Sequence, residues 1–226
     1  MLAGTRRLTG PSSRLRLPIT PAILTSFLGT LNLHSAIDAM YWAACCLAFF
    51  AFLRCSEFTV PSLAAYDPSR HLSLADISVD SRSSPSVLFL RIKTSKTDQF
   101  FKGATLQIGP SGFAVCAVRA MSHYLHVRGG SPGPLFILPD GTPLNRQLLT
   151  AFLRGRLDYC GYRGYYAPHS FRIGAATTAA ACGLPEHLIK ALGRWRSEAY
   201  QTYISLPSSR LQQVASLLVS RSQCLA

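Results

Sequence analysis

The chain has 226 residues, which is long enough for one domain of ordinary to large size with a substantial core. Hydrophobic residues make up 48% of it and aromatic residues 10%, a composition that excludes a disordered tail. Lysine and arginine number 23 against 10 acidic residues, and the net charge of +13 favours a polyanionic partner such as nucleic acid. A basic surface without any nucleic-acid function is the less favoured alternative on charge alone.

The N-terminal residues 1–18 are basic and rich in Gly, Pro and Ser, and they lack the apolar segment of a secretory signal. We expect them to form a loose lead-in. A helix is predicted over residues 19–31, with Thr20 as its N-cap and Pro21 in its first turn.

The most apolar stretch, AMYWAACCLAFFAFL, covers residues 39–53 and lies between Asp38 and Arg54. Its fifteen uncharged residues are fewer than the about 20 that a membrane-spanning helix needs. The pattern therefore predicts a buried central helix and no membrane partner. Ser35 is the predicted cap, and we expect the helix to run into FLRCSEF and to stop before Pro61.

The pattern changes to strands after residue 70. HLSLADISVD (71–80) predicts a short strand, SVLFLRIK (86–93) a strong one, and ATLQIG (104–109) its antiparallel partner. The segment KTSKTDQFFKG is then a hairpin tip that carries Lys93, Lys96 and Lys102. These lysines could lie on a solvated turn, or the hairpin could bring an ammonium into a groove as a proton donor or phosphate contact.

The rest of the chain is mainly helical. A turn-rich connection, SPGPLFILPDGTPL, contains one predicted short strand, and helices are predicted over 112–127, 144–159, 169–182, 185–193, 197–204 and 207–221. The sum is an α+β fold that is mostly helical, with a small antiparallel sheet packed at one edge.

The seven cysteines are scattered and form no pair of C-x-x-C motifs. Several lie in apolar runs, where a reduced cysteine packs as a small hydrophobic residue. We therefore expect a reducing, intracellular compartment and no zinc site.

Two arginines accompany strongly apolar helical segments. In HSFRIGAATTAAACG a spacing of three places His169 and Arg172 on one helix face, and Gly183 is a predicted C-cap. A buried arginine needs an anionic partner. That partner could be an internal acid, and for Arg54 a local pair with Glu57 is the simplest choice. Alternatively, the two arginines meet at one phosphate, which a guanidinium binds through two hydrogen bonds.

Tyr203 is the candidate nucleophile. A phenol has a pKa near 10 in water, and a cluster of cations around a phosphate would favour both the phenolate and a pentacoordinate transition state. The alternative is that Tyr203 only packs, together with Tyr200 on the same helix face.

The order of these features resembles the tyrosine recombinase (phage integrase) family over residues 20–221. FLRCSEF is similar to the first arginine box, SKT at 95–97 to the lysine hairpin, and PHSFRIGAATTAAACGLPEHLIKALGRWRSEAYQTYI to the second box. SKTDQ together with GRW and the tyrosine is similar to crypton and DIRS-type mobile elements.

The resemblance implies type IB transesterification of DNA through a 3′-phosphotyrosyl intermediate, without ATP, metal or another cofactor. Tyr203 would attack, Lys96 would protonate the leaving 5′ oxygen, and His169 would assist proton transfer. The phosphate would be held by Arg54 and Arg172. Further DNA contacts are expected from four residues, Lys93, Lys102, Arg194 and Arg196.

The residue after LG is usually histidine in this family, or tryptophan in some members, and it hydrogen-bonds the phosphate. This sequence has Arg194 there, followed by Trp195. We expect Trp195 to take that role through its indole N–H. Arg194 is the alternative, either in that role or as a contact to the DNA backbone.

The family normally carries an N-terminal clamp domain, but only about twenty residues precede the first predicted helix. We expect residues 1–18 to be a basic linker or remnant of that domain and residues 19–226 to be the catalytic domain.

The predicted partners are double-stranded DNA and copies of the chain in a tetramer. The tail LQQVASLLV would dock on a neighbouring protomer or on its own chain. Two other activities are compatible, an inactive DNA-binding protein and a topoisomerase-like nicking and resealing enzyme. The expected location is intracellular, and nuclear in a eukaryotic host.

Overall fold

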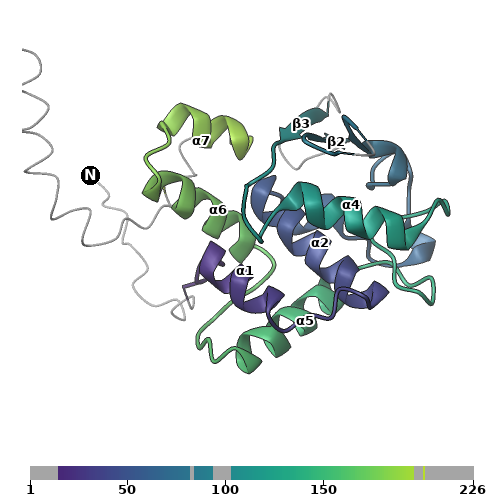
Figure 1. The fold of residues 1–226 in the computed structure, drawn as a ribbon, viewed down its shortest axis with the longest axis horizontal. Helices are drawn as coiled ribbons and strands as arrows, with labels where there is room; N and C mark the ends of the chain where they lie inside the picture. Colours follow the sequence, from purple (N-terminus) through teal and green to yellow (C-terminus); the bar gives the residue numbers. More distant parts are fainter. Residues whose placement is uncertain (1–14, 82–83, 94–102, 196–200, 202–226) are drawn as a thin grey trace, which may run out of the picture.

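The computed structural model describes residues 15–81, 84–93 and 103–195, together with Gln201. Within these residues it contains seven helices and one three-stranded antiparallel sheet of order β1-β2-β3 (Figure 1). The helices are α1 (Pro21–Leu28), α2 (Ala36–Phe50), α3 (Cys55–Phe58), α4 (Ala117–Arg128), α5 (Arg146–Tyr159), α6 (Ser170–Ala181) and α7 (Glu186–Leu192). The strands are β1 (Ile77–Val79), β2 (Leu88–Ile92) and β3 (Ala104–Ile108). The α+β class expected from the sequence is confirmed.

Helix α2 forms the centre of the core. Its residues from Ala39 to Phe49 are all buried, as expected for a helix that is apolar on every side. Figure 1 shows α2 in the middle of the molecule, surrounded by α1, α4, α5 and α6. Across the described part of the chain, no helix has both the length and the hydropathy that crossing a membrane requires.

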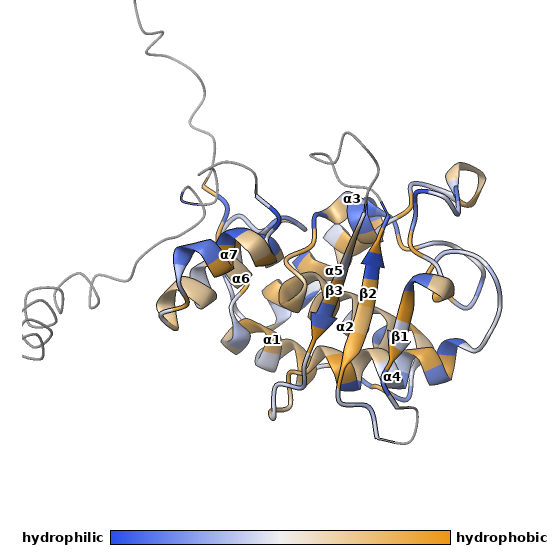
Figure 2. Cartoon of the chain, turned by 90° about the horizontal axis from the view of Figure 1, so that it is seen from above, coloured by the Kyte–Doolittle hydropathy of each residue, from blue (hydrophilic) through white to orange (hydrophobic). Residues whose placement is uncertain are grey.

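The sheet follows the alternation of its sequence. Leu88, Leu90 and Ile92 of β2 are buried, and Leu90 lies opposite Ile77 of β1 and Leu106 of β3. Figure 2 shows the three strands side by side, with apolar residues along each. The predicted pairing of the second and third strands is therefore confirmed.

Two predicted strands are shorter than expected or missing. Residues Leu74–Asp76 form a 3-10 turn before β1, because the Asp76 carboxylate accepts hydrogen bonds from both the backbone N–H and the hydroxyl of Ser73, at 2.9 and 2.7 Å. The strand predicted within residues 131–144 was wrong. That connection makes isolated bridges only, and both bridges involve a proline, which lacks the backbone donor that a continuous ladder needs.

The helix boundaries depend on local caps. Thr20 caps α1 as predicted, accepting from the Ile23 N–H at 3.4 Å. Ser35 occupies the N-cap position of α2 but makes no side-chain capping bond. Helix α4 begins at Ala117 instead of 112, because Gly112 adopts the left-handed conformation with φ 76° and the N-cap residue Cys116 is extended.

The segment before α1 packs against α6, the helix that carries the predicted H-x-x-R motif. The backbone N–H of Leu17 donates to the Tyr165 carbonyl at 2.9 Å, and that of Ile19 donates to Ser170 at 3.0 Å. Gly174 permits this close approach, since a Cβ at that position would lie 1.8 Å from the Ile19 carbonyl oxygen. The described part of the predicted lead-in is thus attached to the helical core.

Candidate functional site

The chain reverses sharply after α2. The N–H of Leu53 donates to the carbonyl of Ala48 at 3.0 Å, and that of Phe52 donates to Phe49 at 3.2 Å, the bond pattern of a Schellman turn. Phe52 adopts the left-handed conformation with φ 51°, a position that usually belongs to glycine. The sequence predicts that the long helix runs into FLRCSEF, and this prediction is wrong, because α2 ends at Phe50. Arg54 instead becomes the N-cap residue of the separate short helix α3.

The same turn occurs at the end of α7. The Trp195 N–H donates to Lys190 and the Arg194 N–H to Ala191, both at 3.0 Å, and Arg194 is left-handed with φ 54°. Phe52 and Arg194 are the non-glycine residues with positive φ in the described part of the chain. The carboxy-terminal turns of two helices distant in sequence thus share an uncommon backbone conformation.

Arg172 joins these two turns. It lies in the first turn of α6 and is only 1% exposed. Its Nη1 donates to the Phe52 carbonyl and its Nη2 to the Gly193 carbonyl. Carbonyls at helix C-termini carry partial negative charge, so they suit a guanidinium. The indole ring of Trp195 covers the same group, with Cζ 4.1 Å from the ring centroid.

Glu57 is the centre of a second set of contacts. Its Oε1 is 3.0 Å from Arg54 Nη1, and its Oε2 is 2.8 Å from Arg194 Nη2. The Arg54 N–H also donates to Oε2 at 2.8 Å. The local Arg54–Glu57 pair considered from the sequence is therefore present, but the buried carboxylate also binds an arginine from the end of α7. The spacing of three suggested one of these bonds, whereas the bond to Arg194 left no local signal.

His169 immediately precedes α6 and is surrounded by positive charge. Its pKa is lowered to about 4, first by burial and then by four nearby guanidinium groups, those of Arg172, Arg16, Arg54 and Arg146. His169 is consequently neutral at physiological pH, and it can donate or accept a hydrogen bond there or take up a proton.

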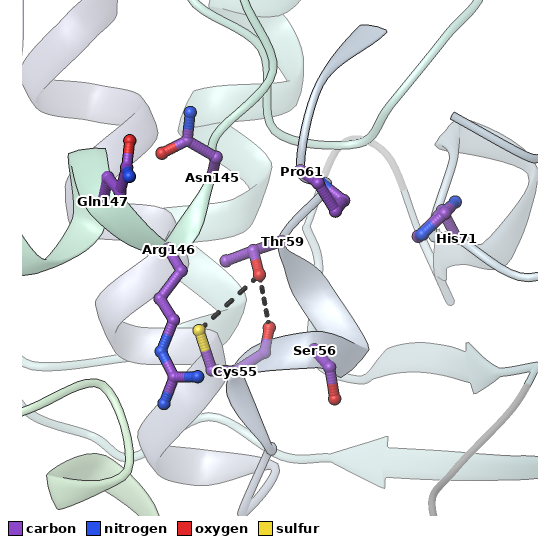
Figure 3. Close-up of a pocket in the computed structure, with 8 residues that line it drawn as sticks. All are labelled: Cys55, Ser56, Thr59, Pro61, His71, Asn145, Arg146 and Gln147. Carbon is purple, nitrogen blue, oxygen red and sulfur yellow. Dashed lines mark hydrogen bonds between the residues drawn. The ribbon is translucent and has the colours of Figure 1, made fainter. Parts of the chain in front are cut away.

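A groove lies beside the arginines, between the start of α3 and the start of α5 (Figure 3). Its lining residues are Cys55, Ser56, Thr59, Pro61, His71, Asn145, Arg146 and Gln147, and none of these eight is acidic. Figure 3 shows Arg146 extending from α5 toward Cys55, the residue after Arg54. The Asn145 Oδ1 accepts from the Leu148 N–H at 2.9 Å, so the amide donors of Asn145 remain for the groove. The groove therefore offers donors to an acceptor-rich ligand.

The structure brings five of the sequence-predicted residues into this one region: Arg54, His169, Arg172, Arg194 and Trp195. Lys93 follows β2 and makes a different set of contacts. Its Nζ lies 2.5 Å from the Asp76 carboxylate and donates to the carbonyls of Pro68 at 2.6 Å and His71 at 3.1 Å. Four other predicted site residues lie outside the described residues: Lys96, Lys102, Arg196 and Tyr203. The same holds for Tyr200 and, apart from Gln201, for the last two predicted helices.

Within the described ranges, no group of three or more His, Cys, Asp or Glu side chains is arranged to hold a metal ion. The six cysteines in those ranges are all free thiols. The polar chemistry of the region is therefore that of arginines, one carboxylate, an imidazole and backbone carbonyls.

Comparison with solved structures finds close resemblance over most of the chain. The XerH site-specific recombinase in a post-cleavage complex with a palindromic difH substrate matches 92% of the chain, with TM-score 0.67 and 15% identity. The fold is that of a tyrosine-recombinase catalytic domain. The XerA recombinase gives TM-score 0.64 at 17% identity over 92% of the chain, and a lambda integrase dimer bound to a COC′ core site gives 0.59 at 14% over 89%. Comparisons with protein-family models and with curated protein sequences find no match.

The chain spans 54% of the XerH chain, 66% of the XerA chain and 62% of the lambda integrase chain. It therefore corresponds to part of each of these proteins. At such identities the likeness concerns the fold alone.

Proposed function

We propose that this chain is the catalytic domain of a site-specific DNA recombinase that acts by type IB transesterification. The observation that carries the proposal is the cluster of Arg54, Arg172 and Arg194 at the turns after α2 and α7, with Glu57 shared between two of these arginines. A neutral His169 lies close to Arg172 and Arg54. Such a site stabilises an anion that gains negative charge during a reaction. A phosphodiester under nucleophilic attack is an anion of this kind. The recombinase fold supports the same reading.

In the proposed reaction the Tyr203 oxygen attacks a DNA phosphorus atom and forms a 3′-phosphotyrosyl bond. The P–O5′ bond breaks, and Lys96 gives a proton to the departing 5′ oxygen. Arg54 and Arg172 stabilise the negative charge of the transition state. His169, which is neutral, assists the transfer of the tyrosine proton. Attack by a 5′ hydroxyl on the phosphotyrosine reverses the steps, so the bond energy is retained.

Double-stranded DNA is the proposed substrate. The net charge of +13 and the groove without acidic side chains both favour a polyanion close to the arginines. Strand exchange would require copies of the chain on two duplexes, and a tetramer is the proposed assembly. We further propose an origin in a crypton- or DIRS-like mobile element, an intracellular site of action that is nuclear in a eukaryote, and the division into a linker at 1–18 and a catalytic domain at 19–226.

The experiment that tests the proposal is cleavage of a nicked suicide duplex made from the ends of the chain's own element. The expected product is a protein–DNA adduct that survives denaturation, is absent in Tyr203→Phe and persists in Tyr200→Phe. Adduct formation that persists in Tyr203→Phe would reject the assigned nucleophile. A second assay with two intact duplexes separates recombination from topoisomerase-like nicking and resealing, because only recombination joins strands of different duplexes.

One observation favours a second candidate, a DNA-binding protein without cleavage activity. Arg172 is 1% exposed and already binds two backbone carbonyls, so it does not face an open surface. Salt-sensitive DNA binding without any adduct would favour this candidate.

A further inference from the structure

We infer that Arg194, and not Trp195, is the phosphate-contacting residue after the LG pair, and that Trp195 is a positioning residue for Arg172. This inference rests on the proposed recombinase function and assigns roles within the same site. It also differs from the role that we expected for Trp195 from the sequence.

The ring of Trp195 packs against two neighbouring side chains. One face lies over the Arg172 guanidinium at 4.1 Å, and the ring meets Phe52 edge to face at 6.3 Å and 88°. Gly193 leaves room for it, since a Cβ at position 193 would lie 1.6 Å from Cζ3 of the indole. These contacts fix the tryptophan between the α2 turn and the α7 turn. The ring therefore holds Arg172 against its two carbonyls.

Arg194 belongs to the charged cluster. Its left-handed conformation at the end of α7 accompanies contacts from its Nη2 to Glu57 at 2.8 Å and from its Nη1 to the Ala51 carbonyl at 3.1 Å. Through Glu57 it is linked to Arg54, which the same carboxylate binds. Arg54 and Arg194 are therefore held as a pair with one acid between them.

The Arg194 side chain has one donor without a partner. Its Nε is buried and makes no hydrogen bond, although its two terminal nitrogens do. A buried donor without an acceptor is unfavourable, so this edge of the guanidinium is suited to a ligand oxygen. A phosphodiester supplies such oxygens, and a guanidinium can bind them through two parallel bonds.

An arginine at position 194 keeps its positive charge at pH values where a histidine there would be neutral. Burial lowers the pKa of Arg194, Arg54 lowers it further, and Glu57 opposes the shift. A guanidinium nevertheless stays protonated throughout the physiological range. A histidine at the same position would lose its charge near pH 6.5. The positive charge of this site is thus permanent.

The test compares the single-turnover rate of adduct formation on the nicked suicide duplex between pH 5.5 and 8.5 for several variants. Arg194→Ala is expected to lose about 10²–10³-fold in rate. Arg194→His is expected to keep part of the rate at pH 5.5 and to lose it as pH rises through the histidine pKa. Trp195→Phe retains an aromatic face without an indole N–H, and it is expected to stay within about threefold of wild type. Trp195→Ala is expected to lose about tenfold or more, because Arg172 loses its cover.

A loss in Trp195→Phe equal to that in Arg194→Ala would overturn the inference, as would a wild-type rate in Arg194→Ala. Thermal unfolding of each variant identifies losses caused by misfolding. Arg194→Lys serves as the matched control, because it keeps the charge and is expected to recover part of the rate.

A second measurement tests the inference even if no adduct forms in the wild-type chain, an outcome that would count against the proposed function only. The affinity for a random-sequence 40-base-pair duplex is measured over a range of KCl concentrations. Arg194→Ala is expected to reduce the slope of log K against log salt by about one, whereas Trp195→Phe leaves it unchanged. Equal slopes for wild type and Arg194→Ala would overturn the phosphate contact.

Discussion

Two charged clusters in this molecule differ in how their charges balance. Near the sheet, Asp76 binds the single ammonium of Lys93 at 2.5 Å and also accepts two bonds from Ser73. At the ends of α2 and α7, Glu57 is shared by Arg54 and Arg194, while Arg172 relies on backbone carbonyls. The first cluster is neutral by itself and stabilises the fold. The second retains excess positive charge, which an anionic ligand would stabilise.

Replacing the most buried cation should have the largest effect. In Arg172→Lys a compact ammonium cannot span the carbonyls of Phe52 and Gly193 in the way that a planar guanidinium does. Adduct formation on the suicide duplex should fall by about 10²–10³-fold, because the transition state loses a preorganised donor. A rate close to wild type in a folded Arg172→Lys variant would show that Arg172 is only structural.

Removing the acid of the Asp76–Lys93 cluster should lower stability and leave the rate of adduct formation unchanged. Asp76→Asn leaves the largely buried Lys93 ammonium without its counter-charge. The free energy of unfolding, measured by urea denaturation, should fall by about 3 kcal/mol, the order found when one partner of a buried pair is removed. The adduct rate of the folded fraction should be unchanged. A parallel loss of rate would mean that the two clusters are coupled.

Because His169 has a lowered pKa, the free energy of unfolding should depend on pH. Its folded pKa of about 4 lies below the ordinary value, so the unfolded chain binds more protons between these two values. Stability should therefore be complete above about pH 6.5 and decline as the pH falls toward 4. Since the imidazole is only half-buried, we expect a loss on the order of 1–2 kcal/mol. In His169→Asn the free energy of unfolding should vary less with pH between these two values. An identical pH profile in both proteins would contradict the lowered pKa of His169.

The smallest expected effect concerns DNA binding by Lys93. Because Asp76 and two carbonyls already engage its ammonium, Lys93→Met should leave the salt dependence of DNA affinity unchanged while lowering stability. Arg146→Met is the contrasting variant, since Arg146 is exposed in the groove. It should reduce the salt slope by about one. A reduced slope for Lys93→Met would instead support the DNA contact predicted from the sequence.

The sequence alone predicted features that depend on neighbours in the chain. The uncharged run before Arg54 indicated the buried helix α2, and the alternation around Leu88 and Leu90 indicated the paired strands. Gly183 ends α6 in a Schellman turn as expected, with φ 80° and the Leu184 N–H bonded to the Ala179 carbonyl. Periodicity and caps are local properties, so one chain is sufficient to read them.

The roles within the site needed the tertiary structure. The sequence placed Arg54 at the end of a long helix, paired Glu57 with it alone, and favoured Trp195 as the phosphate contact. In the fold, the left-handed Phe52 separates Arg54 from α2, and the end of α7 brings Arg194 to Glu57 and Trp195 to Arg172. The sequence by itself thus determined the helices, the sheet and the presence of an arginine-rich motif. The partners of Arg172 and Arg194 were decided only by the tertiary structure, because the carbonyls of Phe52 and Ala51 and the carboxylate of Glu57 lie more than a hundred residues away in the chain.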